Sequence, residues 1–159
     1  MSKEDITLEH SGKAFTAQLT RAKTLDDKAE KLAAAVVVVI GFHLIDSSML
    51  KLQGSAAIQA VISIAALALL GASLVAAYLG RRIQKYVGYP KAAEFLDMLS
   101  PNDVDEERAK LLVAKVYLNA AESNREINNK KAQWLTLSSW LLLVGLLAAV
   151  ISATISKML

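Results

Sequence analysis

Three polar residues that precede the last apolar segment fall on one face of a predicted helix. Asn124, Asn128 and Lys131 follow one another at intervals of four and three residues, so a helix places them side by side. Asp27 and Lys28 precede the first apolar segment in the same way. Two amides, two ammonium groups and a carboxylate could bind an anionic small molecule through charge-assisted hydrogen bonds. Alternatively, they form a polar layer between two helices, in which Asp27 pairs with Lys131 and fixes the register.

A second polar group lies within or beside apolar sequence. His43 and Asp46 are three residues apart, and Gln59 and Ser63 are about one turn apart in the next apolar segment. Ionisable groups at membrane depth usually face a pore, a cavity or a partner, so these four residues are candidates for a pore lining. The alternative is that Asp46 lies at the outer interface and a neutral His43 is hydrogen-bonded to a neighbouring helix. Gln59 and Ser63 are then its candidate partners.

The sequence contains no recognisable catalytic or metal-binding set. It has no cysteine and two histidines, and it lacks the HExxH and P-loop motifs. We therefore expect no enzymatic activity, no metal ion and no cofactor. A net charge of +3, carried by 18 basic and 15 acidic residues, is too small and too mixed to indicate a nucleic-acid partner.

The elements that position these residues follow from the segregation of apolar and charged residues. The chain is 54% hydrophobic and 21% charged, and the apolar residues gather in three blocks, residues 32–50, 56–79 and 134–155. The shortest block, with 19 residues, would be about 28 Å long as a helix at ~1.5 Å per residue, close to the ~30 Å of a hydrocarbon core. The sequence predicts an all-α integral membrane protein with three transmembrane helices, a hairpin plus one.

The basic residues predict the orientation. Residues 1–31 hold six Lys and Arg and residues 81–133 hold ten, whereas residues 51–55 and 156–159 hold one each. By the positive-inside rule, the N-terminal helix 1–31 and the region 80–133 are cytoplasmic. The connector 51–55 is then an outer loop, and 156–159 is an outer tail.

Two helical stalks are predicted to continue directly into membrane spans. No breaker follows Gly12 before the first span, and none lies between residues 100–103, a predicted helix start, and Gly145. A short amphipathic piece is expected at 91–99. Small residues recur at every fourth position in the second and third spans, a pattern that favours close helix association within one subunit or between subunits. They are Ala72, Ala76, Gly80, Gly145, Ala149 and Ala153.

Two stretches of the sequence resemble a known family. LDDKAEKLAAAVVVVIGF (25–42) looks like the opening of the Pycsar transmembrane effectors, and NAAESNREINNKKAQWLTLSSWLLLVGL (119–146) is similar to their closing pattern. Asp26-Asp27 stands where that family has Ala-Asp. The wider group of SLATT-like membrane effectors has a similar plan of spans.

The resemblance implies an effector of a two-gene bacterial antiphage system. A neighbouring pyrimidine cyclase would make cUMP or cCMP on infection, and the effector would sense it, disrupt the inner membrane and kill the infected cell. The family pattern carries onto Asp27, Lys28, Asn124, Asn128 and Lys131. The expected partners are the lipid bilayer, the cyclic nucleotide and further copies of the chain, since three helices enclose no aqueous lumen. The competing interpretation is a small structural or holin-like membrane protein that senses no nucleotide.

Overall fold

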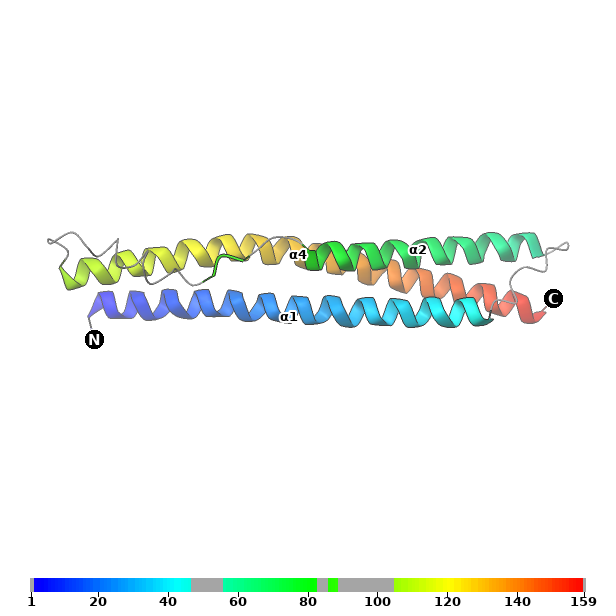
Figure 1. The fold of residues 1–159 in the computed structure, drawn as a ribbon, viewed down its shortest axis with the longest axis horizontal. Coiled ribbons are helices and arrows are strands. Elements are labelled where there is room, and N and C mark those ends of the chain that lie inside the picture. Colours follow the sequence, from blue (N-terminus) through cyan, green and yellow to red (C-terminus); the bar gives the residue numbers. More distant parts are fainter. Residues whose placement is uncertain (1, 47–55, 83–85, 89–104, 159) are drawn as a thin grey trace. The chain divides into compact units, whose positions relative to one another are not determined.

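The described residues form three long helices. The computed structural model describes residues 2–46, 56–82, 86–88 and 105–158. Figure 1 shows α1 (Lys3–Asp46), α2 (Ala56–Arg82) and α4 (Glu106–Met158), and the described residues contain no strand. The chain divides into two compact units, each of which is considered by itself. We call residues 1–24 and 84–129 the polar unit, and residues 25–83 and 130–159 the apolar unit.

The predicted continuity of the first and last helices is confirmed. α1 passes from Lys3 to Asp46 through Gly12, and α4 passes from Glu106 to Met158 through Gly145. α1 begins at Lys3, where Ser2 and Asp5 form a capping box. The Asp5 N–H donates to Ser2 Oγ (3.2 Å), and the Ser2 N–H donates to Asp5 Oδ2 (3.0 Å). The predicted outer loop 51–55, the piece at 91–99 and the helix start at 100–103 lie outside the described residues.

The polar unit is held by a small apolar cluster between α1 and α4. Phe15 is fully buried and contacts the buried Ala120 and Ala121. Its ring centroid lies 5.5 Å from that of Tyr117, within the range at which aromatic pairs add to the energy of burial. The two alanines let α4 approach the large ring closely, so this cluster aligns the two helices.

An ion pair joins the same two helices near the start of α1. Lys110 Nζ lies 2.8 Å from Asp5 Oδ1 and 2.8 Å from Glu106 Oε1. The hydrogen bond from Lys110 lowers the pKa of Asp5 from 3.8 to about 2, and the bonds to Asp5 and Glu106 raise the pKa of Lys110. Asp5 therefore stabilises the folded chain in its ionised form.

We expect the Asp5 contribution to be lost in acid. A carboxyl whose folded pKa is depressed adds stability above its ordinary value, 3.8, and loses it as the pH falls through the folded value, about 2. The stability difference between the wild-type chain and Asp5→Asn should therefore be largest near neutral pH and shrink towards pH 2. Denaturant midpoints of the detergent-solubilised chain, followed by circular dichroism, measure it. Glu4→Gln is the matched control. If its stability difference from the wild-type chain shrank equally towards pH 2, the Asp5–Lys110 pair would not be the cause.

In the apolar unit, one row of buried positions of α2 alternates at intervals of three and four residues. This spacing is that of a heptad repeat, which winds helices around one another with a left-handed supercoil. This row of α2 comprises Ser63, Ala66, Leu70, Ser73, Ala77 and Gly80, and Ala76 is buried beside it. The buried positions of α4 in this unit are Lys131, Leu135, Ser138, Gly145, Ala149 and Ser152. Most of these side chains are small. The helices can therefore approach closely, and no large apolar core forms between them.

The small residues predicted to pack at every fourth position coincide only in part with this interface. Ala76, Gly80, Gly145 and Ala149 are buried, Ala153 is half-buried and Ala72 is exposed. A straight four-residue row drifts around the helix, whereas alternating steps of three and four residues stay on one face. Ala72 therefore lies outside the contact surface of the single chain.

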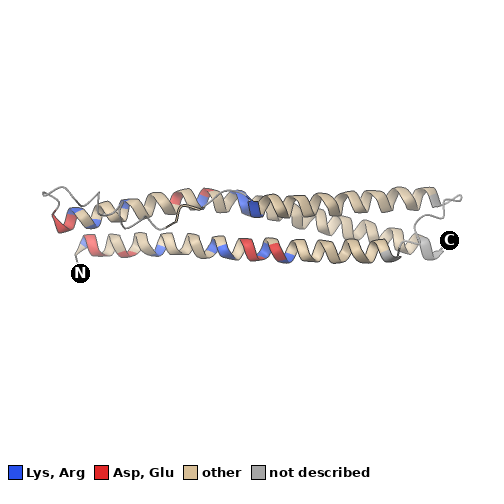
Figure 2. Ribbon diagram, in the orientation of Figure 1, with Lys and Arg blue, Asp and Glu red and all other residues tan. Residues whose placement is uncertain are grey.

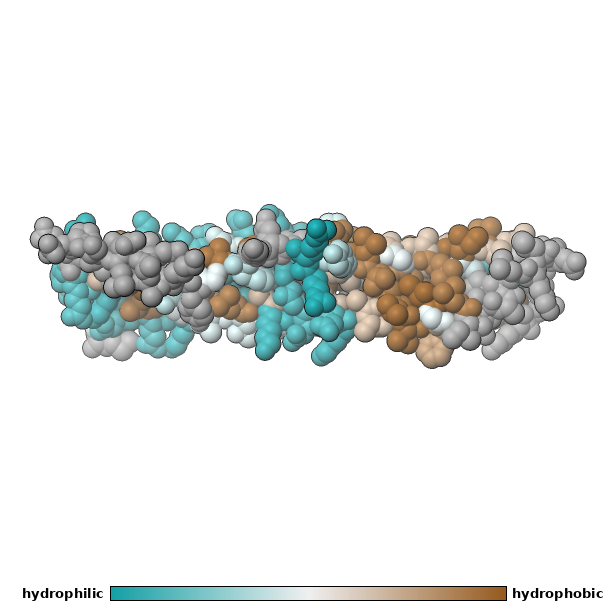
Figure 3. Space-filling view, viewed as in Figure 1, coloured by the Kyte–Doolittle hydropathy of each residue, from teal (hydrophilic) through white to brown (hydrophobic). Residues whose placement is uncertain are grey.

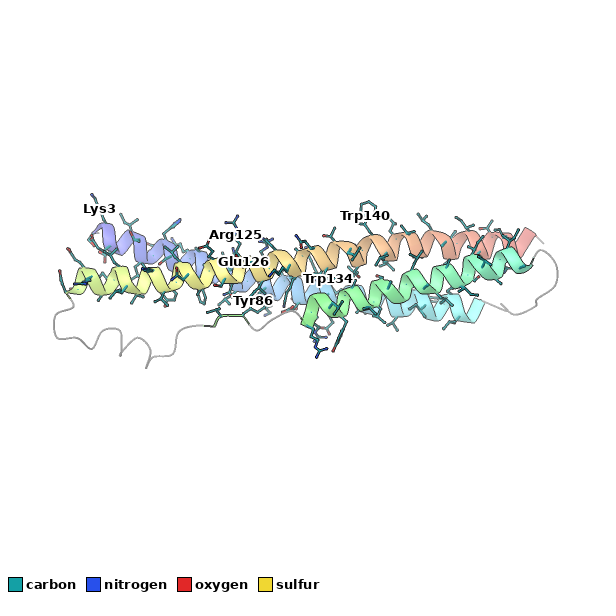
Figure 4. The ribbon with its side chains drawn as sticks, turned by 90° about the horizontal axis from the view of Figure 1, so that it is seen from above. Lys3, Tyr86, Arg125, Glu126, Trp134 and Trp140 are labelled. Carbon is teal, nitrogen blue, oxygen red and sulfur yellow. The ribbon has the colours of Figure 1, made fainter. Side chains whose placement is uncertain are left out.

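The large apolar side chains of the apolar unit point outwards. Phe42 is 70% exposed, Ile64 67% and Trp140 62%, and Figure 4 shows Trp140 projecting away from the neighbouring helices. In Figure 3 the described surface over this unit is largely brown, while the surface of the polar unit is mostly teal. Small polar residues inside and large apolar residues outside invert the usual arrangement in water, which suits a surface that faces lipid.

Two helices are long and apolar enough to cross a membrane. Among the described residues these are α2, within Ala57–Arg82, and α4, within Glu106–Ile155. They point to membrane association. The first predicted span, residues 32–50, is described only as far as Asp46, as part of α1. The sequence has no Lys, Arg, Asp or Glu between Lys31 and Asp46, and Figure 2 shows the later part of α1 in tan.

Candidate functional site

Asn124 is fully buried in the polar unit and binds the backbone of another segment. Its Oδ1 accepts a hydrogen bond from the Val87 N–H (3.0 Å), and its Nδ2 donates to the Val87 carbonyl (3.0 Å). A side-chain amide and a peptide group here form a two-point pair, one donor and one acceptor on each side. The pair holds the non-helical residues 86–88 against α4.

Asn128, one turn further along α4, is also fully buried. Its Oδ1 accepts a hydrogen bond from Tyr86 Oη (3.0 Å), and its Nδ2 donates to the carbonyl and to Oε1 of Gln18 on α1 (2.9 and 3.0 Å). Figure 4 shows Tyr86 beside α4. Asn128 thus joins three parts of the polar unit, and a buried amide with these partners is costly to replace.

Lys131 is buried in the apolar unit and forms an ion pair with α1. Its side chain is 3% exposed, and its Nζ lies 2.6 Å from Oδ1 of Asp26, which is 39% exposed. The predicted pair with Asp27 is therefore wrong by one residue. One residue corresponds to a turn of about 100° around a helix. Asp26 consequently faces α4, while Asp27 is exposed.

The five predicted ligand-binding residues are divided between the two units. Asn124 and Asn128 lie in the polar unit, whereas Asp27, Lys28 and Lys131 lie in the apolar unit. Lys28 is exposed like Asp27. The two amides and Lys131 bind groups of the chain itself, an arrangement that fits the polar-layer alternative.

The four residues predicted as a second polar group do not form one cluster in the structure. His43 is buried, and no described residue makes a hydrogen bond to its Nε2. The predicted partner Ser63 binds Ser152 Oγ (2.5 Å), and Gln59 is half-buried. Ser63 is therefore not the partner of His43. The side chain of Asp46 lies outside the described residues.

His43 instead lines an apolar groove of about 510 Å³. Leu146, Ala149 and Ala153 of α4 form the facing side of this groove. His43, for which the sequence suggested a pore lining or a hydrogen bond between helices, therefore lies among apolar groups, with its Nε2 buried.

A reciprocal serine pair was missed by the sequence analysis. Ser73 Oγ donates to the Ser138 carbonyl (2.7 Å), and Ser138 Oγ donates to the Ser73 carbonyl (2.8 Å). Hydroxyl bonds of this kind join helices within apolar surroundings. Serine at alternating steps of three and four residues among small residues would have been the signal, because that spacing keeps the hydroxyls on the contact face.

Comparison with family models, with curated proteins and with solved structures finds no match to this chain. The fold itself defines the class: an all-helical protein, over its described residues, in which two long apolar helices indicate membrane association.

Proposed function

We propose that the chain is an integral protein of a bacterial inner membrane with three spans, at residues 32–50, 56–79 and 134–155. The N-terminus and residues 80–133 are cytoplasmic, and the C-terminus is outside. The exposed apolar side chains of the apolar unit support insertion into the membrane. The distribution of Lys and Arg supports the orientation. Alkaline-carbonate extraction tests the membrane insertion, and cysteine accessibility at introduced sites in 51–55 and 80–133 tests the topology.

We further propose that this protein is a Pycsar-type effector, which a cyclic pyrimidine nucleotide activates to disrupt the membrane. One observation carries the proposal. The two stretches that resemble the family, residues 25–42 and 119–146, meet through the ion pair of Asp26 and Lys131, 105 positions apart in sequence. Two segments that carry the pattern of one family are expected to pack on each other when they form one functional site.

The continuity of α1 and α4 supports a route from signal to membrane. Each helix carries polar sequence at one end and apolar sequence at the other without a break. A ligand that binds better to an alternative arrangement of the polar residues would shift the population towards it. Rotation or separation of an unbroken helix moves the apolar end together with the polar end.

The pairing geometry of Asn124 suggests how a pyrimidine could be recognised. The amide already pairs with one adjacent N–H donor and C=O acceptor, both from Val87. Uracil and cytosine each present a donor beside an acceptor on the edge of the ring. Purines do so too, so this pair accounts for binding of a base, and the choice of a pyrimidine comes from the family resemblance. A pyrimidine could therefore take the place of Val87, releasing residues 86–88 from α4. We propose Asn124 and Asn128 as the amides that bind the base.

We expect full-length chain in lipid nanodiscs to bind cUMP or cCMP more tightly than cAMP, measured by isothermal titration calorimetry. Asn124→Ala should weaken this binding about tenfold or more, since a two-point pair in a buried site contributes about 1–3 kcal/mol. Asn129→Ala, an exposed amide on the same helix, is the control. Failure of the folded wild-type chain to bind either pyrimidine nucleotide would exclude the sensing role.

The cellular test is co-expression with the neighbouring cyclase. We expect membrane depolarisation and a reduced phage titre only when the cyclase is active. Membrane disruption requires several subunits in this proposal, and the exposed Ala72 is available for contact between them.

The alternative is a small structural or holin-like membrane protein. The internal hydrogen bonds of Asn124 and Asn128 favour it, because a purely structural polar layer would be satisfied in the same way. Depolarisation without any cyclase would support the holin-like alternative. A lower stability of the folded chain together with an unchanged nucleotide response in Asn128→Leu would assign the layer to structure alone.

A further inference from the structure

A groove separate from the one lined by His43 runs between α1 and α4 in the apolar unit, and we call it the α1–α4 groove. It has a volume of about 520 Å³, which is comparable to small-molecule sites. One end is lined by Lys28 and Lys31 of α1, and the rest is mainly apolar, with Leu32 and Ala35 from α1 and Leu135 and Leu142 from α4. The groove therefore combines a cationic end with an apolar body.

The two lysines provide the free hydrogen-bond donors of this groove. Neither has an ion-pair partner among the described residues, whereas Lys110 and Lys131 do. The groove also contains two hydroxyls, but their protons are used within α4. Thr136 Oγ1 donates to the Ala132 carbonyl (2.9 Å), and Ser139 Oγ donates to the Leu135 carbonyl (2.8 Å). No carboxylate lines the groove, so its cationic end is suited to an anion.

The order of residues fits an amphiphile that lies along the helices. Lys28 and Lys31 precede Leu32, the first residue of the proposed first span, and Ala35 is two helical turns beyond Lys28. In the proposed orientation the ammonium groups lie at the level of the inner lipid head groups, and Leu32, Ala35 and Leu142 lie deeper. Basic pockets between helices on the cytoplasmic side bind anionic head groups.

A second groove, between α1 and α2, provides a contrast. It has a volume of about 400 Å³, and Glu30 and Arg81 both line it. Charges of both signs at its edge do not select an anion. The chemistry of an anionic amphiphile therefore matches the α1–α4 groove and not this one.

We propose that the α1–α4 groove binds an anionic phospholipid of the inner leaflet. Lys28 and Lys31 bind the phosphate, and an acyl chain lies against Leu32, Ala35, Leu135 and Leu142. The inference rests on the membrane insertion given under the proposed function and is independent of nucleotide sensing. It assigns Lys28 to lipid, in place of the nucleotide site predicted from the sequence.

The test is native mass spectrometry of the full chain released from nanodiscs of phosphatidylglycerol and phosphatidylcholine in equal amounts. We expect the wild-type chain to retain phosphatidylglycerol in preference to phosphatidylcholine. Lys28→Gln/Lys31→Gln should lower this preference about tenfold. Lys23→Gln/Lys130→Gln removes the same charge from exposed positions of α1 and α4 outside the groove and should leave it unchanged. Ala35→Phe, which fills the groove without altering charge, should also reduce retention.

The outcomes separate this inference from the proposed function. Equal retention of both lipids by an inserted wild-type chain would overturn the lipid site alone. An equal loss in both double-lysine variants would reduce the effect to net charge and would also overturn it. Displacement of the lipid by cUMP or by glycerol 3-phosphate would assign the lysines to a soluble anion. A chain extracted by carbonate would overturn the membrane insertion and the lipid site together.

Discussion

Asp26→Asn should destabilise the folded chain by about 2 kcal/mol, whereas Asp27→Asn should change its stability by less than about 0.5 kcal/mol. Both substitutions remove one negative charge from neighbouring positions of α1. Asp26 faces the ammonium of Lys131, whose side chain is 3% exposed, while Asp27 is exposed. When a buried ammonium loses its carboxylate, the free-energy cost of its desolvation remains. Most of the favourable electrostatic interaction that offset this cost is lost. The partial exposure of Asp26 limits the size of the effect.

Unfolding of detergent-solubilised chain by sodium dodecyl sulfate, followed by circular dichroism, measures this difference. The double variant Asp26→Asn/Lys131→Met should recover part of the loss, because no buried ammonium remains without its carboxylate. Equal effects of Asp26→Asn and Asp27→Asn would contradict the register of α1 against α4 within the apolar unit. The pair is also where the two family-like stretches meet, so Asp26→Asn should abolish any nucleotide-dependent depolarisation as well.

Gly145→Ile should have the largest effect of any single substitution in the apolar unit, a loss of about 3 kcal/mol. A Cβ atom at Gly145 would lie 3.0 Å from Cγ and Cδ2 of Leu70 and 3.3 Å from its backbone nitrogen. The remaining atoms of isoleucine would force α4 away from α2. The neighbouring Ser73–Ser138 pair depends on the same close approach of the two helices, and its hydrogen bonds would lengthen.

Gly71→Ile provides the matched control for this prediction. It introduces the same side chain into α2, but nothing lies within 4 Å of a Cβ at Gly71. Gly145→Ala combined with Leu70→Ala should lower the stability by less than the sum of the two single substitutions, because the shortened partner leaves room for the new methyl group. Unfolding midpoints in detergent compare these variants and the two single alanine substitutions. If Gly71→Ile were as disruptive as Gly145→Ile, the loss would come from helix propensity rather than from the helix contact.

Sequence patterns were sufficient for the helices but not for the contacts between them. The absence of breakers after Gly12 and before Gly145 predicted two unbroken helices, and both are observed. The spacing of Asn124, Asn128 and Lys131 predicted one helix face, and all three side chains are buried. Periodicity determines which residues share a face, because the geometry of a helix is local.

The residues that each helix face contacts could not be predicted from the sequence in the same way. Asp26 and Asp27 are adjacent and chemically identical, so no local property decides which of them meets Lys131. Four-residue spacing singled out Ala72, which the structure leaves exposed, because the supercoil follows steps of three and four residues instead. Asn124 and Asn128 were expected to bind a ligand or to form part of a polar layer between two helices. No pattern near Tyr86 and Val87 indicated that this segment would bind them.

The sequence by itself determined that this protein is built from long helices with segregated polar and apolar stretches. Composition and periodicity are properties of neighbouring residues, and they suffice for that result. Only the tertiary structure decided that Lys131 pairs with Asp26, that Asn124 binds the Val87 backbone, and that Lys28 and Lys31 border an apolar groove. Those contacts join residues far apart in the chain, and they depend on the rotation and register of whole helices. A turn of about 100° around one helix axis would exchange every partner.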